Sequence, residues 1–253
     1  MPMPCLPGLT EHLDAVTNAP SVEVLWDLHR SRMAEYGFDR LIYGYTRYRS
    51  GASLGDPDDW IVLTNQSAEY MDAFIGAGLY QNAPMLQWAL ENDGACSWRW
   101  MSVPGHLTPE ENRVKDFNLQ HGVRAGYTVS FRSVSFRSKG AIALTARAGL
   151  DQSDVDRIWD EHGEEIIVAN NVAHLKLMTL PHSGSRRLTP RQREVLGWVG
   201  DGKTIQDIAL LLEVSPTTIE KHLRLARESL SVETTAQAVL KAAFQNQMFV
   251  IGA

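Results

Sequence analysis

The hydrophobic positions of the first 180 residues follow two different periods along the chain. Apolar residues three or four positions apart predict amphipathic helices, whereas short runs rich in β-branched and aromatic residues predict strands. The order of these segments predicts an α/β/α sandwich around an antiparallel sheet. We expect helices at 10–36, 66–78, 83–91 and 151–178, a further helix that begins after Thr108, and strands at 41–48, 60–64, 127–134 and 141–148.

The pattern changes after residue 180, where a short polar stretch with Pro181 and Gly184 precedes purely helical periodicity. Such a composition is typical of a linker. We therefore divide the chain into an N-terminal domain at 1–180, a linker at 181–187 and a C-terminal domain at 188–253. The expected fold class is α+β, with the sandwich followed by an all-α domain of four helices.

Helix-start signals divide the C-terminal domain. Each of the first three helices follows a Ser or Thr that can cap it, and the first also has Pro190 and a capping box. The expected caps are Thr189, Thr204 and Ser215, and a fourth helix is expected at 236–249. Only residues 213–215 separate the second helix from the third. This spacing, with polar residues early in the third helix, is typical of a helix-turn-helix.

The residues of this domain also resemble a known family. The motifs that carry the resemblance, to the LuxR-type DNA-binding domain, are Leu188-Thr-Pro-Arg-Gln-Arg-Glu-Val-Leu196, Gly202-Lys-Thr204, Asp207-Ile-Ala209 and Thr218-Ile-Glu-Lys-His222. The resemblance implies a homodimer that reads a roughly two-fold operator in double-stranded DNA, with RNA polymerase as a further partner. We expect base and phosphate contacts from Thr217, Thr218, Lys221 and Arg224, and phosphate contacts from Lys203 and Arg227.

Charge is distributed unevenly between the two domains. The net charge is −6, yet from Arg186 onward nine Lys and Arg face seven Asp and Glu, so the excess of acidic residues lies upstream. This asymmetry favours a basic module joined to an acidic one. The composition is that of a soluble protein, and no apolar run or secretory signal indicates a membrane partner, so we expect a cytoplasmic protein. The two cysteines, Cys5 and Cys96, lack metal-ligand spacing.

Three functions are conceivable for the N-terminal domain. A phosphorylated receiver requires an acidic cluster after its first strand, and residues 41–45 offer none. An enzyme has weak support, because Glu161, His162, Glu164 and Glu165 would spread around a solvated helix; we therefore predict no catalytic residues and no enzyme activity. Aromatic residues are dense between Tyr43 and Trp100, which is compatible either with a plain core or with an apolar ligand cavity.

Residues 10–180 resemble the autoinducer-binding domain of LuxR-type quorum-sensing regulators. The order of a strand, Thr64-Asn-Gln, Ala83-Pro84-Met85, Trp98 and His121-Gly-Val-Arg-Ala-Gly126 carries the resemblance. It implies a sensor and dimerisation domain that binds an acyl-homoserine lactone between a five-stranded antiparallel sheet and helices, with Trp98 at the position of a donor to the lactone carbonyl. The implied ligand-binding residues are Tyr45, Gln66, Tyr70, Phe74, Ala83, Pro84, Trp98 and Thr145.

Ala83 departs from the family pattern, which has an aspartate before Pro84 to accept a hydrogen bond from the ligand amide. A methyl group cannot accept, and an unpaired ligand amide costs roughly 1–3 kcal/mol. Asn82 or Gln66 could compensate. The sequence therefore predicts a regulator that senses an atypical acyl-homoserine lactone or a related small amphiphile, with no other cofactor and no metal. A ligand-independent regulator with a filled pocket is the alternative.

Overall fold

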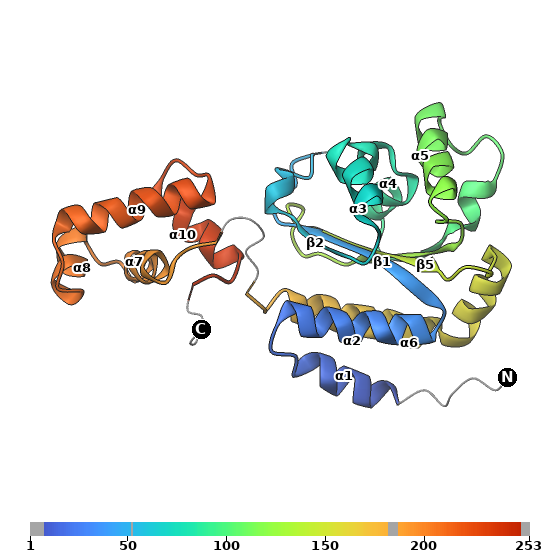
Figure 1. The fold of residues 1–253 in the computed structure, drawn as a ribbon, viewed down its shortest axis with the longest axis horizontal. Helices are drawn as coiled ribbons and strands as arrows, with labels where there is room; N and C mark the ends of the chain where they lie inside the picture. The colour runs from blue at the N-terminus through green and yellow to red at the C-terminus, as the bar shows by residue number, and fades with distance from the viewer. Residues whose placement is uncertain (1–7, 52, 182–186, 249–253) are drawn as a thin grey trace. The chain divides into compact units, whose positions relative to one another are not determined.

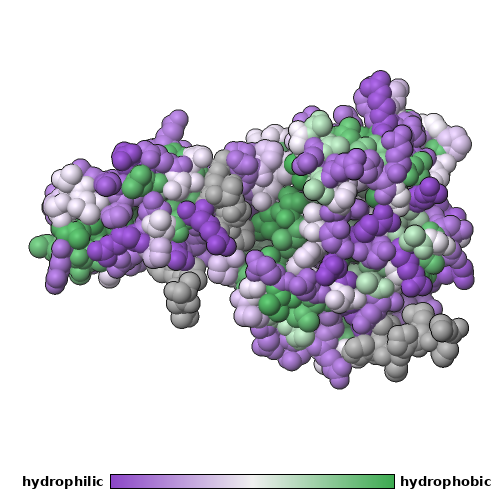
Figure 2. All heavy atoms as spheres, in the orientation of Figure 1, coloured by the Kyte–Doolittle hydropathy of each residue, from purple (hydrophilic) through white to green (hydrophobic). Residues whose placement is uncertain are grey.

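A computed structural model of the chain describes residues 8–51, 53–181 and 187–248. The chain splits into two compact units, Met1–Met178 and Thr179–Ala253. The expected linker at 181–187 falls largely on residues 182–186, which lie outside the described residues, as do Cys5 and Arg186. Polar side chains cover most of the visible face of each unit, and apolar patches are scattered among these polar side chains (Figure 2). None of the helices described is long and apolar enough to cross a membrane.

A five-stranded antiparallel sheet with the order β2-β1-β5-β4-β3 forms the centre of the first unit. Its strands are β1 (Phe38–Thr46), β2 (Ile61–Thr64), β3 (Gly94–Ser97), β4 (Gly126–Phe131) and β5 (Lys139–Ala146). The predicted strands are present with shifts of one to three residues at their ends. The strand β3 was not predicted, because its sequence Gly-Ala-Cys-Ser has little β-propensity and its pairing with β4 holds it in place.

Two helices, α2 (Val22–Glu35) and α6 (Gln152–Leu177), cover one face of the sheet, and α1 (Leu9–Thr17) packs against them on the side away from the sheet (Figure 1). The prediction of one helix at 10–36 is wrong. Asn18 ends α1, Pro20 cannot continue the helical hydrogen bonds, and the hydroxyl of Ser21 accepts from the Val24 N–H to begin α2. The break turns the chain so that α1 and α2 both pack against α6.

Shorter elements cover the other face (Figure 1). They are α3 (Ala68–Met71), the π turn η2 (Asp72–Gly76), the 3₁₀ turns η1 (Pro57–Asp59), η3 (Leu79–Asn82) and η4 (Trp98–Ser102), and the helices α4 (Pro84–Glu91) and α5 (Pro109–Gln120). The helix expected at 66–78 is thus one α turn followed by a π turn. The capping box predicted at the start of α5 is present, between Thr108 and Glu111.

Four helices make up the described part of the second unit: α7 (Pro190–Gly200), α8 (Ile205–Leu211), α9 (Pro216–Leu230) and α10 (Thr235–Phe244). The predicted caps Thr189, Thr204 and Ser215 each accept a hydrogen bond from the first turn. The turn between α8 and α9 is one residue longer than expected, and Glu213 within it has a left-handed φ of 53°. An apolar core joins all four helices. The α+β architecture is therefore the predicted one.

Candidate ligand cavity and DNA-binding surface

A cavity of about 190 Å³ lies in the first unit between the sheet and the elements α3, η3, α4, η4 and α5. Its floor includes three small residues on neighbouring strands, which are Gly44 of β1, the paired Ala141 of β5, and Ala143 opposite Ile42. Larger residues at these positions would fill the space. The cavity thus follows from strand alternation that places small residues on one face of the sheet.

Most of the predicted ligand-binding residues lie against this cavity. The lining residues among them are Tyr45, Tyr70, Phe74, Ala83, Pro84, Trp98 and Thr145. Gln66 is not part of the lining, and its backbone N–H donates to the Thr64 hydroxyl at 3.0 Å. Asn82 is exposed and does not line the cavity either. Neither expected substitute for an aspartate therefore faces the ligand space.

Ala83 is buried at the point where η3 meets α4, and its methyl group lines the cavity. It occupies the N-cap position of α4, before Pro84, and gives that helix no side-chain cap. The described lining contains no Asp or Glu side chain at all. No described residue therefore offers a carboxylate in the cavity to accept a hydrogen bond from a ligand amide.

Trp98 forms a wall of the cavity at the start of η4. Its indole ring lies against Gly126, where a Cβ would come within 2.9 Å of the ring and within 2.2 Å of the Leu144 carbonyl. The only indole N–H donates to the Thr128 hydroxyl at 2.9 Å. In this arrangement Trp98 shapes the cavity, and a ligand carbonyl would have to compete with Thr128 for its N–H.

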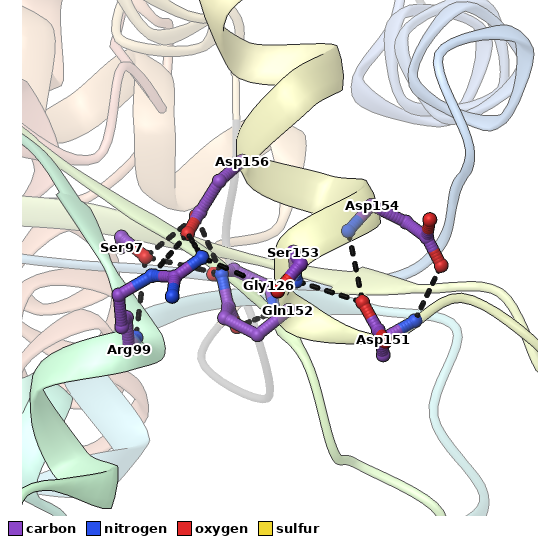
Figure 3. A network of polar contacts seen from close by, with 8 residues as sticks. All are labelled: Ser97, Arg99, Gly126, Asp151, Gln152, Ser153, Asp154 and Asp156. Carbon is purple, nitrogen blue, oxygen red and sulfur yellow. Dashed lines mark hydrogen bonds and ion pairs between the residues drawn. The ribbon is translucent and has the colours of Figure 1, made fainter.

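A polar network holds the Trp98 wall to the first turn of α6 (Figure 3). The Gln152 amide accepts from the Gly126 N–H at 3.0 Å and donates to the Ser97 hydroxyl at 3.0 Å. Asp156 accepts from Ser97 at 2.8 Å and from Arg99 at 2.6 Å. Burial opposes the ionisation of Asp156, but these hydrogen bonds outweigh it, so the pKa of the carboxyl is lowered.

Two aromatic residues close the cavity on the side of α3. The rings of Tyr70 and Phe74 are stacked with centroids 5.5 Å apart, and the Tyr70 hydroxyl donates to the Asn118 side chain at 2.8 Å. Burial raises the pKa of Tyr70, so its phenol stays neutral. Trp60 and Tyr80 also line the cavity, whereas Tyr43, Tyr48, Trp88 and Trp100 from the same aromatic-rich region do not.

Several lining residues were missed from the sequence. They include Gly44, Ala141 and Ala143 on the strands, Thr128 on β4 and Lys115 on α5. The run from 141 to 145 alternates small residues with Ile142 and Leu144, and this alternation was a usable signal for a strand with an unfilled face. The sequence offered no comparable signal for Lys115, whose neighbours on α5 are mostly polar.

The second unit presents a polar helix surface opposite its core. On α9 the buried residues Ile219, Leu223, Ala226 and Leu230 form one stripe. Thr217, Lys221 and Arg224 lie on the opposite, exposed side. Because α9 follows α8 after a tight turn, it is the second helix of a helix-turn-helix, the one that enters the major groove in such motifs.

The remaining predicted contact residues differ in their exposure and in their contacts with other side chains. Lys203 is exposed in the turn before α8. Thr218 is half-buried, and its hydroxyl lies 2.9 Å from that of Ser215. Arg227 donates to the Thr235 hydroxyl at 3.1 Å. The guanidinium of Arg224 pairs with Glu228 at 2.6 Å, but both side chains are more than half exposed, so the pair is weak enough to be exchanged for a phosphate.

Each of the two units matches a known family. Residues 21–177 match the model of the autoinducer binding domain, and residues 186–242 match that of the bacterial regulatory proteins of the LuxR family. The transcriptional activator SolR of Ralstonia nicotianae is 27% identical over 245 residues, which cover 93% of this chain and 97% of SolR.

Two solved structures share the fold. The N-acylhomoserine-lactone-dependent LuxR-family transcription factor CepR2 of Burkholderia cenocepacia has a TM-score of 0.52 at 18% identity, covering 67% of this chain and 93% of CepR2. SdiA in complex with octanoyl-rac-glycerol has a TM-score of 0.53 at 16% identity, covering 94% of this chain and 93% of SdiA. Members of these families are regulators, so the prediction of no enzyme is confirmed. The chain belongs to the LuxR-type transcriptional regulators, with an autoinducer-binding domain followed by a LuxR-family helix-turn-helix.

Proposed function

We propose that this protein is a cytoplasmic regulator whose binding to DNA is controlled by an acyl-homoserine lactone or a related small amphiphile in the cavity of the first unit. The observation that supports this proposal most directly is the cavity itself, about 190 Å³ in volume and lined mainly by apolar and aromatic side chains. Ligand sites are typically of this kind. A ligand-independent regulator is not favoured, because its pocket would be filled by side chains.

Residues of α9 read the operator in this proposal. Thr217, Lys221 and Arg224 contact bases and phosphates, with a smaller share from Thr218, whose hydroxyl lies beside Ser215. Lys203 contacts a phosphate from the turn before α8, and Arg227 does so while it supports the start of α10. Phosphate contacts position the helix and supply affinity, whereas base contacts supply specificity.

The complete regulator acts as a homodimer on a roughly two-fold operator, and it contacts RNA polymerase from there. One helix-turn-helix buries little area on DNA, so two modules that read two half-sites gain both affinity and specificity. Because phosphate contacts release counterions, binding of the full chain to its operator should weaken steeply as salt rises.

Fluorescence anisotropy with an operator selected from a random DNA pool tests both halves of this proposal. Lys221→Ala and Arg224→Ala should each weaken binding at least about tenfold without changing the melting temperature. Arg113→Ala, an exposed cation on α5, is the matched control and should bind like the unmodified chain. Lactones and other small amphiphiles are then added. Operator binding that no added compound changes, by a protein purified free of ligand, would overturn control by a ligand.

A further inference from the structure

The cavity lining holds three cationic side chains and, among the described residues, no carboxylate. Lys139 is neutralised, because its ammonium lies 2.7 Å from the Asp93 carboxylate. Lys115 and Arg124 have no ion pair within 4.0 Å in the described parts of the chain. Arg124 is exposed, so water screens its charge, whereas Lys115 is half-buried. Among the described residues, the cavity therefore carries one half-buried cationic side chain without a counterion.

Lys115 projects from α5 toward η4, where its ammonium donates to the Met101 carbonyl at 3.0 Å. A carbonyl oxygen satisfies one of the three ammonium N–H groups but leaves the charge uncompensated. Half-buried charges are usually paired, because the loss of hydration disfavours them. A negatively charged group in the cavity would supply the missing partner and would use the two remaining donors.

Thr145 is a second polar residue of the cavity lining without a described side-chain partner. It is 1% exposed, it lines the cavity, and its hydroxyl has no hydrogen bond to any described residue. Thr145 pairs with Gly126, on which the Trp98 ring lies, and Met101 follows Trp98 in the same turn. The unused hydroxyl thus lies on the strand beside Gly126, the ammonium lies at the turn that Trp98 begins, and both residues line the cavity. The rest of the lining includes the apolar side chains of Leu54, Trp60, Val62, Leu86, Ala89 and Leu90.

We propose that the cavity binds a compact amphiphile whose head group is a carboxylate, with Lys115 as its counterion and the Thr145 hydroxyl as a hydrogen-bond donor. The apolar tail extends away from Trp98. A dry cavity of about 150 Å³ accommodates benzene, so a cavity of about 190 Å³ favours a short tail over a long acyl chain. This inference depends on the proposed function, in which the cavity is the ligand site.

Isothermal calorimetry on the full chain with hexanoate and methyl hexanoate tests the charge directly, because the two probes differ little in shape. Hexanoate should bind at least about tenfold more tightly than its ester, as expected for one charge-assisted hydrogen bond. In Lys115→Met, which keeps the apolar stem, this preference should disappear while ester affinity stays the same. Arg113→Met, an exposed cation on the same helix, should keep the preference.

A second variant provides an independent test if Lys115→Met does not fold. Thr145→Val preserves shape, removes the hydroxyl and should weaken hexanoate binding severalfold. Equal or tighter binding of the ester by the unmodified chain overturns the inference, and so does a preference that survives Lys115→Met. Binding of N-butanoyl-homoserine lactone without binding of hexanoate overturns the carboxylate head group but leaves the proposed function intact. If no probe binds, both fail.

Discussion

The two faces of the same sheet are built in opposite ways. On the face covered by α2 and α6, the paired residues Leu41 and Leu144 are completely buried, and the pair Tyr43 and Ile142 is 1% exposed. Phe131 of β4 stacks on His174 of α6 on this side, with ring centroids 4.1 Å apart. The opposite face has the small residues Gly44, Ala141 and Ala143 among its alternate positions, and there the cavity lies.

One strand can therefore contribute both to stability and to ligand recognition. Residues of β5 alternate between the filled face and the cavity, so neighbours in the sequence have different roles. Large side chains on the filled face gain burial free energy and dispersion contacts. Small side chains on the cavity face give up part of that gain and leave room for a ligand.

The largest expected effect comes from truncating the filled face. Leu144→Ala should lower the free energy of unfolding by about 3–4 kcal/mol, because it opens a new void in a close-packed region. Ile42→Ala on the cavity face should cost less than half as much, because its half-buried side chain already borders empty space. Urea denaturation followed by tryptophan fluorescence compares them, with unchanged m-values as the control. Equal losses for the two variants would abolish the distinction between the faces.

Filling the cavity should separate binding from stability. Ala143→Leu places three more carbon atoms in the ligand space and should weaken hexanoate binding about a hundredfold, or about 2.7 kcal/mol, while the melting temperature stays within a few degrees. The same exchange at Ala169, fully buried on α6, is the matched control and should destabilise the fold by about 1–3 kcal/mol. Hexanoate binding by Ala143→Leu at the original affinity would place the ligand elsewhere.

His29 is buried on α2, on the filled side of the sheet. Its protonation tests whether water reaches that side. Burial, the largest cause, and the charge of His12 lower the pKa of His29 to about 4, although a hydrogen bond to Asn170 opposes the shift. The unfolded chain has a histidine pKa of about 6.5. The unfolded state therefore takes up the proton first as pH falls. The stabilisation by neutral His29 is complete above pH 6.5 and is lost as pH falls toward 4.

Through this linkage, the free energy of unfolding falls by about 2 kcal/mol between pH 7 and pH 5. His29→Gln should remove that share of the pH dependence, measured from urea midpoints at the two pH values. His12 and His174, whose pKa values burial also lowers to about 4, would keep the rest. His106→Gln, at an exposed position, is the control and should leave the dependence unchanged. If the urea midpoint of His29→Gln depends on pH as strongly as that of the unmodified chain, water reaches this side.

The smallest expected effect concerns a single missing acceptor at the cavity. Ala83→Asp should tighten binding of N-butanoyl-homoserine lactone about tenfold, or about 1.4 kcal/mol, because a carboxylate can accept from the ligand amide. It should weaken hexanoate by repulsion. Since residue 83 is the N-cap of α4, the new side chain can also accept from that helix, which offsets the cost of its burial.

Ala83→Asn is the matched control, since its side chain can accept without charge. It should improve lactone binding and leave hexanoate unaffected. Calorimetry on the three proteins gives the comparison. Tight lactone binding by the unmodified chain, together with a loss of stability in Ala83→Asp, would falsify the idea that Ala83 makes this sensor atypical.

Elements whose signals are local could be predicted from the amino-acid sequence alone. Caps such as Thr108, Thr189 and Ser215 begin the helices they were predicted to begin, because capping depends on residues within one turn. The stripe of apolar residues on α9 likewise predicted which side of that helix is buried. The family motifs carried the assignment of two domains and of DNA binding, since they span nearly every helix of the second unit.

Which residues meet in the cavity depends instead on packing between segments that are distant in the sequence. The strand β3 forms because β4 is beside it, and α1 and α2, which Pro20 and Ser21 separate, are placed by their packing on α6. Gly44 faces Ala141 across nearly a hundred residues of sequence, and Lys115 reaches the carbonyl of Met101 from another element. Contacts of this kind depend on register and packing between distant segments, which no local pattern encodes. Whether a face of small residues is filled or left open is settled only when its covering layer is in place.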